Sequence, residues 1–118
     1  MPTSGLALPA TLRVDERRAL TGYVAFLQRR FGNRIRDLRL FGSRARGEGH
    51  EESDLDVLVV IDGLTTKERR EVWEYSGDLL LAHEVMVGGL ATSTADWQQL
   101  RDMGRRIVRE IERDGIPL

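Results

Sequence analysis

The sequence of 118 residues contains no cysteine, which excludes disulfides, thiolate metal sites and thiol nucleophiles. It has one lysine, Lys67, so arginine supplies the rest of its side-chain positive charge. The formal net charge is −1, so no bulk field would attract nucleic acid or anionic lipid. No apolar run approaches membrane-spanning length, and the first residues lack the basic start and long apolar stretch of a secretion signal. We therefore expect a cytoplasmic protein without a membrane association.

The length and composition predict one globular domain. The chain is 41% hydrophobic and 31% charged, which is typical of a folded domain with a single core. Residues 1–12 contain Pro2, Gly5 and Pro9 and are predicted as a flexible lead-in. Residues 13–118 are then predicted to form the domain.

Apolar spacing predicts alternating helices and strands. The expected elements are a helix from Asp15 to about Phe31, strands over Ile35–Phe41 and 54–61, a helix opening at Thr65 or Thr66, a strand over Glu84–Leu90, and a last helix capped by Thr94 and stopped by Gly115 and Pro117. In the helix after residue 65, the residues predicted to face inward are Val72, Trp73, Ser76, Leu79 and Leu80. This order predicts an α/β (α+β) fold, a small sheet flanked by helices.

Two carboxylates begin the most apolar strand, DLDVLVVI. Side chains alternate along a strand, so Asp54 and Asp56 point to the same side, about 6.6–7 Å apart. Two such carboxylates repel each other unless a cation lies between them, and hard oxygen ligands favour Mg²⁺ or Mn²⁺. An isolated pair could also be simply solvated at the start of a strand.

The turn before this strand has the composition of a phosphate site. Gly42 allows a phosphate to approach the backbone, and the Ser43 hydroxyl and the N–H groups of a helix start can hydrogen-bond its oxygens. Arg44 and Arg46 could add charge-assisted contacts, although either could also be a solvated basic residue. A P-loop is excluded because Glu48 stands where that motif requires lysine.

The joined pattern Gly42-Ser43, ten residues, Asp54-Leu55-Asp56 resembles the signature of the minimal nucleotidyltransferases, within the DNA polymerase β-like superfamily. The resemblance implies a small mixed sheet flanked by helices and a Mg²⁺-dependent transfer of a nucleoside monophosphate, AMP from ATP, to a hydroxyl. It implies that Gly42 and Ser43 hold the phosphates and that Asp54 and Asp56 bind metal.

The same family places a third carboxylate on the adjacent strand, where this chain has no central acid. Glu84 is the candidate for this third catalytic and metal-binding position, and a charged strand end is its alternative interpretation. Many family members pair with a helical HEPN-type toxin, which they modify with AMP or mask. The resemblance therefore implies an antitoxin enzyme, with a catalytically lapsed binding subunit that neutralises or scaffolds its partner as the alternative.

Overall fold

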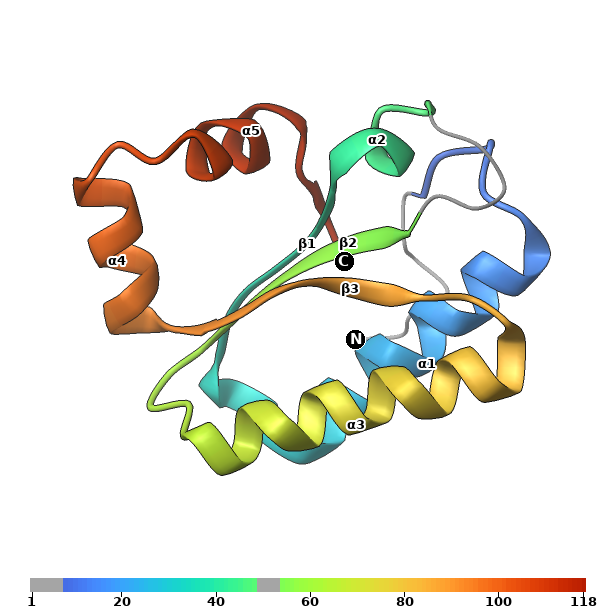
Figure 1. The fold of residues 1–118 in the computed structure, drawn as a ribbon, viewed down its shortest axis with the longest axis horizontal. Helices are drawn as coiled ribbons and strands as arrows, with labels where there is room; N and C mark the ends of the chain where they lie inside the picture. The colour runs from blue at the N-terminus through green and yellow to red at the C-terminus, as the bar shows by residue number, and fades with distance from the viewer. Residues whose placement is uncertain (1–7, 49–53) are drawn as a thin grey trace.

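A computed structural model of the chain describes residues 8–48 and 54–118 (Figure 1). The elements in chain order are α1 (Val14–Phe31), the 3₁₀ turn η2 (Gly32–Arg34), β1 (Ile35–Phe41), α2 (Gly42–Ala45), β2 (Leu55–Ile61), α3 (Thr66–His83), β3 (Val87–Ser93), α4 (Thr94–Asp102), α5 (Arg106–Asp114) and β4 (Ile116–Pro117). The strands form one sheet in the order β3-β2-β1-β4. β1 runs antiparallel to β2 and β4, whereas β2 and β3 are parallel. The predicted mixed sheet flanked by helices is confirmed.

β2 is a central strand with helices on both of its faces. Leu55, Val57 and Val59 pack into the core formed with α1 and α3, whereas Leu58 and Val60 pack with α4 and α5. Figure 1 shows these two helix pairs on opposite sides of the sheet. The two-sided burial explains why this strand is apolar almost throughout.

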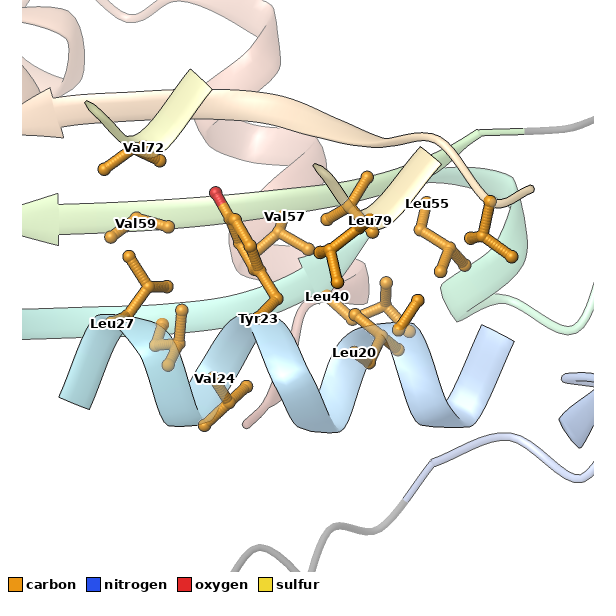
Figure 2. Close-up of a cluster of buried hydrophobic side chains, with 14 of the residues drawn as sticks. Leu20, Tyr23, Val24, Leu27, Leu40, Leu55, Val57, Val59, Val72 and Leu79 are labelled. Carbon is orange, nitrogen blue, oxygen red and sulfur yellow. The ribbon is translucent and has the colours of Figure 1, made fainter. Parts of the chain in front are cut away.

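The core under α1 follows the predicted helical spacing. Leu20, Val24 and Leu27 are fully buried, and Figure 2 shows them beneath the strands. Each such side chain stabilises the fold by about 1.5–3 kcal/mol relative to an exposed position. Tyr23 lies among them, and burial raises the pKa of its hydroxyl to about 12 against the opposing effect of a hydrogen bond with Ser76.

α3 begins where the sequence predicts, but it presents a different face. Thr65 and Glu68 form a reciprocal capping box, with the Thr65 hydroxyl accepting from the Glu68 N–H at 3.1 Å. Trp73 and Leu80 were predicted to point inward and are instead 79% and 39% exposed. Only one side of the helix packs against the other described residues, so part of its apolar surface is exposed.

The predicted strand at Glu84–Leu90 is wrong in its bounds. α3 extends to His83, and Glu84 is its C-cap in the left-handed conformation, with φ 56°. The chain therefore turns before the strand begins at Val87. The apolar residues around Met86 resemble a strand in the sequence, so the strand was predicted to begin too early and the helix to end too early.

The predicted last helix is two helices. Gly104, with φ 64°, lies between α4 and α5 in a left-handed conformation that ends the first of them. Gly115 and Pro117 were expected only to stop the helix, but Pro117 and the neighbouring Ile116 also pair with Arg39 and Leu40 at the edge of β1. An edge position tolerates proline because no neighbouring strand needs its missing N–H. None of the helices among the described residues is long and apolar enough to cross a membrane.

Candidate active site

The end of β1 and the start of β2 bring the glycine turn against the carboxylates. Phe41 lies opposite Asp56 in the antiparallel pair, and Gly42 follows directly. Gly42 has φ +78°, and a Cβ at this position would collide with the Asp56 carboxylate. Both the backbone conformation and the lack of space therefore require glycine. The predicted phosphate turn and a predicted metal ligand are neighbours in the structure.

Ser43 is the second residue of α2 and is half-buried. Its carbonyl oxygen accepts a hydrogen bond from the Glu48 N–H at 2.8 Å, which closes the turn after α2. A backbone contact thus fixes the turn around Ser43 without using the serine hydroxyl.

Asp54 and Asp56 are close enough to interact. Asp56 is half-buried and Asp54 is exposed. Burial, and secondly repulsion from Asp54, raise the pKa of the Asp56 carboxyl above its ordinary value. Neither carboxylate forms an ion pair with another residue of the described chain. A bound cation would relieve this repulsion.

The pair offers part of a metal site. Two carboxylates, completed by phosphate oxygens and water, form a donor set that Mg²⁺ accepts. Among residues 8–48 and 54–118, however, no group of three or more His, Cys, Asp or Glu side chains could hold a metal ion. The structure therefore brings Asp54 and Asp56 together and does not add Glu84, which caps α3 before β3 begins.

Gly88 occupies the position beside Asp56 in the sheet. β2 and β3 are parallel, and their register pairs Asp56 with Gly88. Paired residues on neighbouring strands point to the same face. A Cβ added to Gly88 would meet no atom of the described residues within 4 Å, whereas one added to Gly89 would collide with the backbone of Val57. The position next to Asp56 is therefore open and carries no acid.

Arg44 is buried rather than turned toward the open site. Its guanidinium donates to both carboxylate oxygens of Glu16, at 2.6 and 3.2 Å, and its side chain is only 6% exposed. It also donates to the carbonyl oxygens of Thr11 and Glu48. Most of the Arg44 N–H groups are engaged with these partners, and its contact with a nucleotide stays a prediction.

Glu16 is the partner that balances this buried charge. Burial acts to raise the pKa of its carboxyl, but hydrogen bonds from the Arg13 N–H and from Arg44 outweigh it, so the pKa lies below its ordinary value. The pair joins the start of α1 to the turn that contains Gly42 and Ser43.

Arg46 remains at the surface of the same turn. Its guanidinium donates to Glu48 at 3.1 Å and to Asp114 of α5 at 3.3 Å. Because the side chain is 36% exposed, these contacts are accessible to solvent and can exchange for others.

Sequence reasoning missed two positions that shape this site. Glu16 was not singled out, although an acid in the first turn of a helix is an ordinary helix-start signal. Gly88 was not singled out as a site position either. Its importance follows from the register with Asp56, which depends on the true start of β3.

A family model described as a nucleotidyltransferase domain matches residues 20–113. The chain belongs to this nucleotidyltransferase domain family. A protein of Methanocaldococcus jannaschii, whose name gives protein adenylyltransferase as its provisional activity, is 43% identical over 49 residues. That match covers 42% of this chain and about half, 49%, of the relative.

A solved structure shares the fold of this nucleotidyltransferase domain. A crystal structure of a toxin–antitoxin with AMP-PNP is similar with a TM-score of 0.53 and 24% identity, over 81% of this chain and 69% of that one. A mutant of the toxin–antitoxin MntA–HpeT gives a TM-score of 0.49 and 21% identity, over 80% and 68%.

We expect Glu16→Ala to lower the free energy of unfolding by about 3–5 kcal/mol, because Arg44 would stay buried without its partner. Glu71→Ala is the matched control, since it breaks the exposed pair with Arg30 at 2.7 Å and should cost far less. Urea denaturation followed by circular dichroism measures both. Equal costs for the two variants would contradict the importance of the buried pair.

We expect Asp56→Asn to stabilise the domain at neutral pH in the absence of divalent cations. A carboxyl whose pKa is raised by folding holds its proton more tightly in the folded state, so stability falls as pH rises through its unfolded pKa, about 3.9, to its higher folded pKa. The advantage of the asparagine should therefore disappear below that unfolded pKa. Denaturation across this pH range measures it, with Asp62→Asn at the other end of β2 as control. A gain that persists in acid would refute the electrostatic cause.

Proposed function

We propose that this domain binds a nucleoside triphosphate, together with Mg²⁺ or Mn²⁺, at the turn formed by Gly42 and Ser43 and at the carboxylates of Asp54 and Asp56. The contact between Gly42 and the Asp56 carboxylate carries the proposal, because it puts a close-approach backbone position beside a metal ligand. The raised pKa of Asp56 supports it, because burial, and secondly repulsion from Asp54, disfavour the charged carboxylate and a bound cation would offset both.

The residues have separable roles in this proposal. Asp54 and Asp56 would hold the ion, which neutralises phosphate charge when bound. Gly42 would let the phosphates approach the backbone, and the Ser43 hydroxyl would hydrogen-bond one of their oxygens. Arg46 would exchange its exposed contacts with Glu48 and Asp114 for a phosphate oxygen.

The proposed reaction is transfer of AMP from ATP to a hydroxyl of a partner protein, with pyrophosphate leaving. The provisional name of the Methanocaldococcus jannaschii relative supports a protein acceptor, and the toxin–antitoxin context of the solved fold neighbours suggests the kind of partner. In this proposal the domain is the antitoxin of a helical HEPN-type toxin.

A second candidate function rests on the open position beside Asp56. A transferred hydroxyl proton needs an acceptor. Gly88 has no side chain to accept it, and Glu84, the C-cap of α3, forms no three-residue metal group with the pair among the described residues. With no third acid among residues 8–48 and 54–118, the same site could bind nucleotide without turnover. The domain would then neutralise or scaffold its partner by binding alone.

The double variant Asp54→Asn/Asp56→Asn should lose Mg²⁺-dependent ATP binding and keep its fold, because the site loses both anionic ligands and their repulsion. Isothermal titration calorimetry with and without Mg²⁺ measures the affinity. Asp62→Asn removes one carboxylate at the opposite end of β2 and should bind as the parent does. Unchanged affinity in the double variant would remove the site assignment.

Gly88→Asp distinguishes the two candidate functions. An aspartate there would enter open space beside Asp56 and supply the missing acid. If the parent is a lapsed enzyme, its AMP transfer from labelled ATP should rise by up to about 100-fold, the low end of what a positioned acid or base contributes. Gly88→Asn, of the same shape without the charge, is the control. A parent that already transfers AMP as fast as Gly88→Asp would exclude the lapsed function.

A further inference from the structure

α3 carries an apolar surface that the described chain leaves uncovered. Trp73 is 79% exposed, Leu81 is 85% exposed and Leu80 is 39% exposed. Leu80 and Leu81 follow Trp73 by seven and eight residues, which is about two helical turns. The three side chains therefore share one face of the helix. Large apolar side chains exposed together on one helix face often mark an interaction site.

Gly77 lies in the middle of the same face. A Cβ there would meet no atom within 4 Å, so packing within the described chain does not require glycine. Glycine is a poor helix former at an interior position, and its ordinary use is to let another backbone come close. Gly77 therefore forms a shallow hollow between the protruding side chains of Trp73 and Leu81.

The charges at the two ends of the face are opposite. Arg70 is exposed toward the N-terminal end of α3, and Glu84 is exposed at its C-cap. Neither forms an ion pair with another described residue. The two positions are equally distant from Gly77 along the helix, as are Trp73 and Leu81.

We propose that this face of α3 is the contact surface between two copies of the chain, with the two α3 helices antiparallel and crossing at Gly77. A two-fold axis at Gly77 places Arg70 opposite Glu84 of the second copy and Trp73 opposite its Leu81. Each copy then contributes both charges and both apolar groups. This self-complementarity favours a second copy over an unrelated partner, which would not need a symmetric arrangement.

The neighbouring edge of β3 is a poorer place for self-association. The Arg69 side chain donates a hydrogen bond to the carbonyl oxygen of Ala91 at 3.1 Å, which occupies an acceptor that an added strand would use. Gly88 and Gly89 also weaken the strand. A groove of about 730 Å³ lies between this strand and α3, with Trp73 and Arg70 on its helical wall. The second copy would approach the outer side of that wall.

The contact is expected to be weak. The face from Arg70 to Glu84 is about 21 Å long at helical rise, so it offers less than the roughly 800 Å² per partner of a standard stable interface. We therefore expect a dissociation constant in about the micromolar range. Sedimentation velocity over a series of concentrations should show the mass rising from 13.4 kDa toward twice that value.

Five variants, one of them a control, test the arrangement by their effect on dimerisation. Trp73→Ser should weaken dimerisation by about tenfold or more, whereas Met103→Ser, which alters a 53% exposed methionine after α4, should leave it unchanged. Gly77→Leu should raise the melting temperature of the monomer and yet weaken the dimer, a combination that a purely structural role would not give. Arg70→Glu should weaken the dimer, and adding Glu84→Arg should restore it.

Three results would overturn the proposal. The first is a parent chain that stays monomeric at every concentration. The second is a dimer that is insensitive to Trp73→Ser, or one that the reciprocal charge exchange fails to restore. The third is a monomeric chain whose complex with a different co-expressed protein is lost in Trp73→Ser, which would assign the face to that protein.

Discussion

The buried pair between Glu16 and Arg44 holds the candidate site in place. Through Arg44 it joins the start of α1, the turn that contains Gly42 and Ser43, and the carbonyl oxygens of Thr11 and Glu48. Because both charged groups are nearly inaccessible to water, neither can be removed without leaving the other uncompensated. A positive residue that resembles a phosphate ligand in the sequence therefore acts as the anchor of the turn on which a phosphate would rest.

The site is closely packed on one side of Asp56 and open on the other. Gly42 is required by its conformation and by the proximity of the Asp56 carboxylate, so the turn and the start of β2 fit each other closely. On the other side of Asp56, Gly88 leaves space that nothing in the described chain fills. In the proposed function, nucleotide binding and nucleotide transfer therefore depend on different positions, and one can persist without the other.

The features that the sequence predicted depend on residues close together in the chain, whereas the features that it missed depend on residues far apart. β1 and β2 were predicted almost to the residue, because their apolar runs end at strong turn signals and report their own burial. That Gly42 and Asp56 belong to one site was expected from the family resemblance carried by the joined G-S and D-x-D motifs, whereas their close approach was not predicted. The start of β3, the exposure of Trp73 and the burial of Arg44 depend on partners far away in the sequence, such as Glu16, and no local pattern contains them.

The strand order also sets the sequence of events during synthesis. β1 and β2 are neighbours in the chain and can pair early, and β3 can join as soon as α3 has crossed over the sheet. The outer edge of β1 is different, because its partner residues Ile116 and Pro117 leave the ribosome after every other strand. A nascent chain therefore carries an unpaired backbone edge while the rest of the sheet is already available. This interval is when intermolecular strand pairing, and hence aggregation, is most accessible to the protein.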